Sequence, residues 1–143
     1  MRLIIEKDYE QLAEWAAEHV IKRINDFNPT PQKKFVLGLP TGSSPIGMYK
    51  KLIQAYNEKR VSFKNVVTFN MDEYVGLPAE HPESYHSFMH NNLFKYIDCP
   101  NENIHILNGN AADLEAECAN YEMMINEADG IDLFVGGVGV DGH

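Results

Sequence analysis

Hydrophobic and polar positions alternate along this chain with two periods, one typical of helices and one of buried strands. In residues 8–27 apolar side chains recur at steps of three and four, as in an amphipathic helix, and Asp8 followed by Gln11 resembles a capping box. Three more helices are predicted by the same spacing. They are marked by Met48 to Tyr56, by Tyr85 to Leu93 after a Ser84 cap, and by Leu114 to Ala128 after Asn110 or Asp113.

Short apolar runs lie between these helical stretches and predict five strands. Each run is too brief for a helix and is bounded by helix breakers or polar residues. The predicted strands are 2–6, 35–39, 66–71, 104–107 and 131–135. Because strands and helices alternate and the strands are almost continuously apolar, we expect a Rossmann-like, mostly parallel sheet with helices on both faces. Residues 1–143 are expected to form a single α/β domain that is part of a larger one.

Composition narrows the class of partner. The chain is 44% hydrophobic and 23% charged, as in globular proteins, and its net charge of −9 opposes a nucleic-acid or anionic-membrane partner. No apolar run is long enough to span a bilayer, and Glu6 comes too early for a signal peptide. Cys99 and Cys118 lack the paired spacing of a zinc site. We expect Cys118 to be buried on an apolar helix face and the protein to be reduced and cytoplasmic.

The loop Thr41-Gly42-Ser43-Ser44 is the first candidate site. It joins a buried strand to a helix, so its amides and hydroxyls would converge on the positive end of that helix, an arrangement that suits a phosphate. Gly42 would let the backbone approach a ligand closely, and Pro45 suits a first helical turn. The spacing differs from a Walker A loop. An ordinary strand–helix turn, with a serine or threonine capping the helix, is the equally weighted alternative.

Two adjacent carboxylates, Asp72 and Glu73, follow the strand 66–71. Ligands of parallel sheets bind at the carboxyl ends of strands, where a desolvated carboxylate can accept a proton from carbon. Adjacent side chains on extended backbone point in opposite directions, so at most one of the two should face the site. The alternative is that both acids begin a solvent-exposed loop.

The segment Asp141-Gly142-His143 offers an oriented acid–base pair after the last predicted strand. The glycines at 137, 139 and 142 also match a dinucleotide fingerprint. That fingerprint requires a following helix and an acidic residue about twenty positions later, which the chain does not contain. A nicotinamide-dependent enzyme is therefore the weaker alternative.

Three histidines, at 81, 86 and 90, are close in sequence without forming a recognisable metal motif. His86 and His90 have the spacing of two ligands on one helix face, but no glutamate follows His86 as it does in the zincin pattern. We expect them to line a loop and a helix surface, and we expect no metal site.

Four segments together resemble the glucosamine-6-phosphate deaminase family, and the resemblance spans essentially all of the chain. They are residues 37–45, 67–77, 81–85 and 136–143. Family members are close to twice this length, so the chain resembles their N-terminal half. The resemblance implies conversion of D-glucosamine 6-phosphate and water to D-fructose 6-phosphate and ammonia, without a cofactor or metal.

The resemblance also implies roles for individual residues. Asp72 would remove the C2 proton and return it at C1, His143 would assist opening of the sugar ring, and Asp141 would orient or assist that step. The loop of Thr41, Gly42, Ser43 and Ser44 would hold the phosphate.

The family's ring-opening glutamate, the arginine and lysine of its phosphate site and most of its allosteric pocket for N-acetylglucosamine 6-phosphate would lie beyond residue 143. We therefore expect residues 1–143 alone to be inactive or nearly so. Family members tend to form hexamers, and some are monomers. A sugar-phosphate lactonase, a sugar-phosphate-binding regulator and a half-site completed by another chain are the alternatives.

Overall fold

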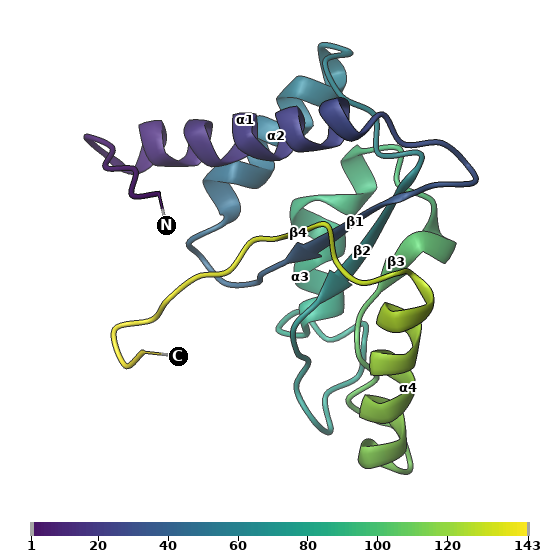
Figure 1. The fold of residues 1–143 in the computed structure, drawn as a ribbon. Helices are drawn as coiled ribbons and strands as arrows, with labels where there is room; N and C mark the ends of the chain where they lie inside the picture. The colour runs from purple at the N-terminus through teal and green to yellow at the C-terminus, as the bar shows by residue number, and fades with distance from the viewer. Residues whose placement is uncertain (1, 143) are drawn as a thin grey trace.

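The computed structural model describes residues 2–142, which are arranged around a parallel four-stranded sheet of order β3-β2-β1-β4 (Figure 1). The strands are β1 (Phe35–Leu39), β2 (Val66–Asn70), β3 (Ile104–His105) and β4 (Leu133–Phe134). The helices are α1 (Tyr9–Phe27), α2 (Ile46–Asn57), α3 (Tyr85–Asn92) and α4 (Leu114–Glu127), with short 3₁₀ turns η1 (Phe94–Tyr96) and η2 (Asn101–Asn103). The predicted fold class is confirmed.

The two central strands form the core of the sheet. They pair over their whole length, from Phe35 opposite Val66 to Leu39 opposite Asn70, and all their residues are buried. Burial on both faces explains why they read as continuous apolar runs rather than alternating ones. On the outer side of β1, the ring of Phe134 occupies the space that a Cβ at Gly38 would need, so glycine lets β4 pack closely there.

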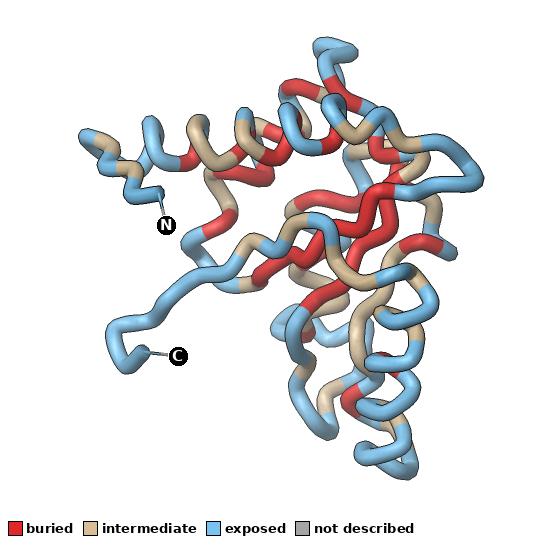
Figure 2. Tube along the Cα trace, in the orientation of Figure 1, coloured by how far each residue is buried: buried red, intermediate tan, exposed pale blue. Residues whose placement is uncertain are grey.

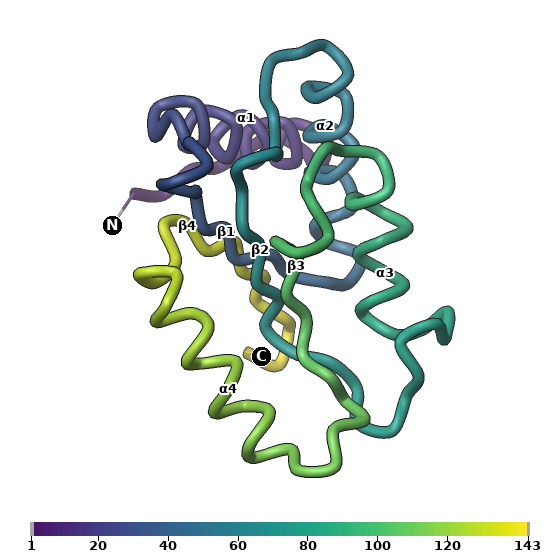
Figure 3. Tube along the Cα trace, turned by 90° about the vertical axis from the view of Figure 1, so that its right-hand side faces the viewer, coloured from purple at the N-terminus to yellow at the C-terminus, as the bar shows by residue number. Residues whose placement is uncertain are grey.

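Helices cover the sheet on both faces. The inward side chains of α1, α2 and α3 pack against Phe35, Leu37 and Leu39, whereas α4 packs against Val36 and the alternate positions of β2. Figure 2 shows the buried residues concentrated between these layers, and Figure 3 shows α1 and α2 on the side of the sheet opposite α4. Strand alternation thus supplies the apolar surface for both layers.

The start of α1 agrees with its sequence signal, because Asp8 accepts a hydrogen bond from the Gln11 N–H at 2.9 Å. Its buried stripe differs in part from the prediction. Leu12 is 48% exposed, and the buried residues are Ala13, Ala17, Val20, Ile21 and Ile24. Small alanines face the neighbouring α2, which lets the two helices approach.

Four of the five predicted strands need correction. Residues 2–6 form no strand, and Leu3 and Ile5 are 76% and 83% exposed, because no described strand pairs with this segment. The runs 104–107 and 131–135 contribute only two strand residues each, since both lie at sheet edges and pair on one side. The strand predicted to reach Met71 ends at Asn70, where the chain turns into the next loop.

The prediction that Cys118 is buried is wrong. Cys118 is exposed and Cys99 is buried, and both are free thiols. Helix α4 packs mainly through Tyr121 and its neighbours, and Cys118 lies at the rim of a 310 Å³ groove that Phe69 and Phe134 also line. Among residues 2–142, none of the helices is both long and apolar enough to cross a membrane.

Candidate functional site

The loops after β1 and β2 begin side by side, because Leu39 and Asn70 are register partners at the carboxyl ends of their strands. This is the edge at which parallel α/β proteins bind ligands. The first loop contains the predicted phosphate-binding residues, and the second begins with Asp72. The register therefore brings the first two candidate segments to one edge of the sheet.

Asn70 and Tyr121 hold the end of β2 in place. The Asn70 side-chain amide donates to the Leu39 carbonyl at 2.8 Å, which links the two strand ends. The Tyr121 hydroxyl accepts from the Asn70 N–H at 3.1 Å and lies 2.9 Å from the carbonyl oxygens of Asn70 and His105. Burial raises the pKa of Tyr121, so its hydroxyl remains protonated and able to donate. These contacts fix where the chain leaves β2 toward Asp72.

The loop Thr41–Ser44 is fixed at its base and open at its tip. Gly42, Ser43 and Ser44 are exposed, and Gly42 adopts a φ of 90° that favours glycine. Behind the tip, the Tyr9 hydroxyl donates to the Ser44 carbonyl and accepts from the Gly47 N–H, both at 2.9 Å. The buried Tyr49 hydroxyl donates to the Pro40 carbonyl. Side chains from two helices thus hold the loop backbone.

Helix α2, which follows this loop, is not capped by its own N-cap residue. That residue is Pro45, one position earlier than a first-turn proline, and it makes no side-chain cap bond; the Tyr9 hydroxyl accepts from one first-turn N–H, that of Gly47. The serine–threonine cap considered as the alternative is therefore not formed. A helix start beside exposed glycine and serine residues is an arrangement in which the N–H groups of the loop backbone and the helix dipole favour an anion.

Asp72 and Glu73 point to different surroundings, as strand alternation predicts. Asp72 is exposed at the rim of the sheet. The Glu73 side chain is only 3% exposed and accepts backbone hydrogen bonds from Tyr74 at 2.8 Å, Tyr85 at 2.9 Å and His86 at 3.0 Å. Burial acts to raise the pKa of Glu73, but these hydrogen bonds outweigh it and lower the pKa below its ordinary value.

Two tyrosines, Tyr74 and Tyr85, pack against each other near Asp72. The Tyr85 hydroxyl lies 3.3 Å from the Tyr74 hydroxyl, and their ring centroids are 4.7 Å apart. The hydrogen bond to Tyr74 and burial raise the pKa of Tyr85 to about 12, a hydrogen bond with Thr41 opposes that rise, and the Asp72 charge adds to it. Thr41 and Asp72 therefore lie close enough to Tyr85 to affect its pKa. Sequence reasoning placed Tyr85 only on a helix face, because nothing local predicts this contact.

The loop after Asp72 is fastened from the far side. The Gly76 N–H donates to the Gly109 carbonyl at 2.9 Å, and the Asn110 side chain donates to the Leu77 carbonyl at 2.6 Å. A Cβ at Gly109 would fall well inside contact distance of the Tyr74 carbonyl oxygen, so the two loops touch backbone to backbone. This contact fixes the position of Tyr74.

The chain beyond β4 is exposed from Gly136 to Gly142, and its last part extends away from the sheet in Figure 1. Its first part, Gly136 to Val138, lines a 270 Å³ groove together with Ser44 and Pro45. Asp141 lies farther along, in a turn closed by the Gly142 N–H and the Gly139 carbonyl at 3.0 Å. His143 lies outside the described residues, so its pairing with Asp141 stays a prediction.

The three clustered histidines occupy a loop and a helix. His86 Nδ1 lies 3.1 Å from a Glu73 oxygen, and His81 Nδ1 accepts from the Glu83 N–H at 3.1 Å. His90 is exposed on α3. Within residues 2–142, no group of three or more histidine, cysteine or acidic residues is arranged to hold a metal ion.

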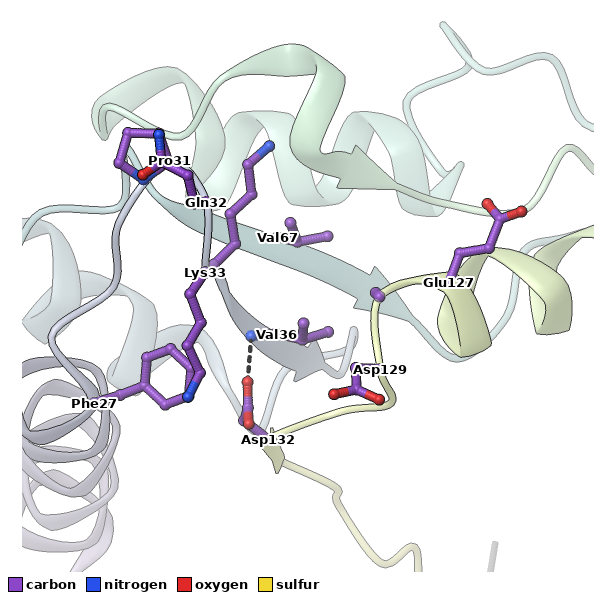
Figure 4. Close-up of a pocket in the computed structure, with 11 residues that line it drawn as sticks. Phe27, Pro31, Gln32, Lys33, Val36, Val67, Glu127, Asp129 and Asp132 are labelled. Carbon is purple, nitrogen blue, oxygen red and sulfur yellow. Dashed lines mark hydrogen bonds between the residues drawn. The ribbon is translucent and has the colours of Figure 1, made fainter.

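A hollow of about 490 Å³ lies at the opposite edge of the sheet, near the start of β1 (Figure 4). Three of the charged residues that line it have partners within the protein. Lys34 donates to Asn103 at 2.6 Å, Lys33 lies over the Phe27 ring, and Asp132 accepts from the Val36 N–H at 2.9 Å. The amino ends of parallel strands are not where such sheets bind ligands. The carboxyl edge remains the candidate site.

Taken together, the fold and this edge define an α/β protein with a candidate anion-binding loop and a carboxylate beside it. The sequence model of the family described as glucosamine-6-phosphate isomerases/6-phosphogluconolactonase matches residues 7–143. The chain belongs to this family.

Similar proteins are named for one of the two activities in the family description. Glucosamine-6-phosphate deaminases of Phocaeicola vulgatus, Porphyromonas gingivalis and Borreliella burgdorferi are 67%, 66% and 61% identical over all 143 residues. The chain spans only about half of their length, namely 54%, 54% and 53%.

Solved structures of proteins named for both activities are also similar to this chain, which again covers only part of each. A monomeric glucosamine-6-phosphate deaminase superimposes with a TM-score of 0.93 at 38% identity, covering 100% of this chain and 57% of that one. A 6-phosphogluconolactonase from Thermotoga maritima has a TM-score of 0.78 at 23% identity, covering 99% of this chain and 61% of that one, which shows a shared fold.

Proposed function

We propose that the protein converts D-glucosamine 6-phosphate and water to D-fructose 6-phosphate and ammonia, an isomerisation of an aldose to a ketose with loss of the amine. The observation that carries the proposal is that the exposed loop Thr41–Ser44 and the exposed Asp72 follow Leu39 and Asn70, which are register partners at one edge of the sheet. The identity of 61–67% to proteins named for this activity supports it.

The loop would bind the phosphate. Exposed backbone at Gly42, Ser43 and Ser44 offers N–H donors, and the two serine hydroxyls add further donors. The positive end of α2 favours the anion despite the net charge of −9, because the helix dipole acts within the first turn whereas surface charges are screened over about 10 Å. Binding there would place the sugar toward Asp72.

Asp72 would act as the base on carbon. Its carboxylate would take the C2 proton of the open-chain aldehyde, the C2–H electrons would form the C1–C2 double bond of an enolamine, and the π electrons of the C1 carbonyl would move to O1, which takes up a proton from water. The proton held by Asp72 would then return to C1 as the nitrogen lone pair forms a double bond to C2. Water would then release ammonia from the resulting imine. A positioned acid–base group contributes typically 10²–10⁴-fold to rate. Asp141 and His143 would assist the preceding opening of the sugar ring.

These steps are proton transfers and a hydrolysis, so the proposal needs no cofactor. We also propose a cytoplasmic location, supported by the free thiols of Cys99 and Cys118, which suit a reducing compartment. Allosteric response to N-acetylglucosamine 6-phosphate and assembly into a homohexamer belong to the same proposal.

The test is turnover of two substrates of the family by a protein of the relatives' full length that contains residues 1–143, called the full chain below, measured separately from turnover by residues 1–143 alone. We expect ammonia and fructose 6-phosphate from glucosamine 6-phosphate, and no comparable hydrolysis of 6-phosphogluconolactone. Replacing Gly42 by valine should raise KM, because a side chain at φ 90° strains the loop. Hydrolysis of the lactone without ammonia release would replace the deaminase proposal with a lactonase.

A further inference from the structure

Glu73 has contacts that a loop carboxylate does not need. Its side chain is 3% exposed, and it accepts three backbone N–H groups besides lying 3.1 Å from His86 Nδ1. Two of the three N–H groups belong to residues twelve and thirteen positions farther along the chain. The carboxylate therefore ties the loop after β2 to the start of α3.

Together with Ser84, Glu73 completes the first turn of α3. Ser84 Oγ accepts from the Ser87 N–H at 3.0 Å, which is the usual capping bond. The Glu73 carboxylate accepts from the N–H groups of Tyr85 and His86, the two residues that precede Ser87. The first N–H groups of a helix have no partner within the helix. A negative charge at this end is also favoured by the helix dipole. The helix is thus held at its start by a residue adjacent to Asp72.

The Glu73 side chain affects two residues of the candidate site, Asp72 through the chain and Tyr85 through a hydrogen bond. Asp72 precedes Glu73 in the chain, so while Glu73 is buried, alternation turns Asp72 to the rim. Tyr85, whose N–H Glu73 holds, carries the hydroxyl that neighbours Asp72 and Thr41. Displacing the Glu73 carboxylate would shift the backbone of both residues at once.

We propose that Glu73 is a positioning residue, which fixes the direction of the Asp72 carboxylate and the place of the Tyr85 hydroxyl by capping α3 from the loop after β2. The inference rests on the proposed function, because it requires Asp72 to act on the C2 proton. Misplacement of a reacting group by about 1 Å can cost 10²-fold in rate. Glu73 would therefore affect the chemical step more than substrate binding.

The test uses Glu73→Gln in the full chain. The amide oxygen of glutamine can still accept from Tyr74 and Tyr85, but its NH₂ group would face the His86 N–H, so that contact is lost. One control variant is matched to it. Glu80→Gln removes the same charge from an exposed position.

The number of sites that can bind ligand is first counted by titration with fructose 6-phosphate. Each rate is then divided by that number, so that a variant with fewer folded molecules does not show a falsely low kcat. We expect Glu73→Gln to lower kcat per site about tenfold to hundredfold, with KM changed less than threefold. Deuterium at C2 of the substrate should slow this variant at least as strongly as the wild type. The Glu80→Gln control should stay within about twofold of the wild-type kcat. Should Glu73→Gln not fold, Glu73→Asp, whose shorter side chain cannot span the gap, is expected to show the same pattern.

Unchanged kcat per site, or a C2 deuterium effect that disappears, would overturn the positioning role while leaving the proposed function intact. A wild-type full chain that releases no ammonia would instead overturn the proposed function itself. The two failures are thus distinguishable in one set of assays.

Discussion

The Tyr121 hydroxyl links the end of β2 to β3, in addition to the pairing of the two strands, and Tyr121→Phe removes that hydroxyl alone. The ring is 8% exposed and packs edge-on against Phe69 with centroids 5.4 Å apart, a contact that phenylalanine keeps. What is lost is the acceptor for the Asn70 N–H and the donor toward the carbonyl oxygens of Asn70 and His105.

The expected cost follows from burial. Asn70 is 2% exposed, so water cannot readily replace the missing partner of its N–H. A buried donor left without an acceptor costs about 1–3 kcal/mol. For a chain of 143 residues, a loss of that size lowers the melting temperature by roughly 3–10 °C.

Thermal and urea denaturation of the wild type and the variant measure this loss. Tyr96→Phe is the matched control, because Tyr96 is 48% exposed and its ring contact with Lys95 survives the change; its expected effect is below about 0.5 kcal/mol. If Tyr121→Phe were as stable as Tyr96→Phe, the hydroxyl would not hold the end of β2 and the account of that strand end would be wrong.

Two further predictions concern the loop that carries Asp72. Gly109→Ala should destabilise the fold by about 1–3 kcal/mol, because the new methyl group would collide with the Tyr74 carbonyl, whereas Gly136→Ala meets open space and should be nearly neutral in the same denaturation assay. Since hydrogen bonds lower the pKa of Glu73 in the folded state, its stabilising contribution should be present above its unfolded pKa of about 4.3 and be lost as pH falls through the lower folded value. Urea midpoints between pH 3 and pH 7 should therefore fall less steeply in acid for Glu73→Gln than for wild type; parallel curves would contradict this linkage.

The central sheet could be predicted from sequence because its strands are buried on both faces. Such strands must be apolar at every position, so β1 was predicted to the residue and β2 to within one. Helix starts were also predictable where a side chain caps a nearby N–H, as Asp8, Ser84 and Asp113 do. These are local signals, carried by residues within three positions of one another.

Features that depend on distant partners could not be predicted in the same way. Residues 2–6 have a strand-like composition, but a strand also requires a neighbour, and composition does not say whether one exists. Cys118 lies on an apolar stripe whose burial depends on what covers α4. The sequence indicated that only one of Asp72 and Glu73 could face the site. That Glu73 turns inward is determined by the N–H groups of α3, which no local pattern near Glu73 indicates.

The measurement that tests the central claim most directly compares wild type with Asp72→Asn in the full chain, recording both ammonia release from glucosamine 6-phosphate and binding of that sugar. Asparagine keeps the size of the side chain but cannot take up a proton as the carboxylate does. We predict that ammonia release falls by about 10²–10⁴-fold while the dissociation constant changes less than about threefold. Release that continues at the wild-type rate would contradict the account, because it would remove Asp72 from the chemical step.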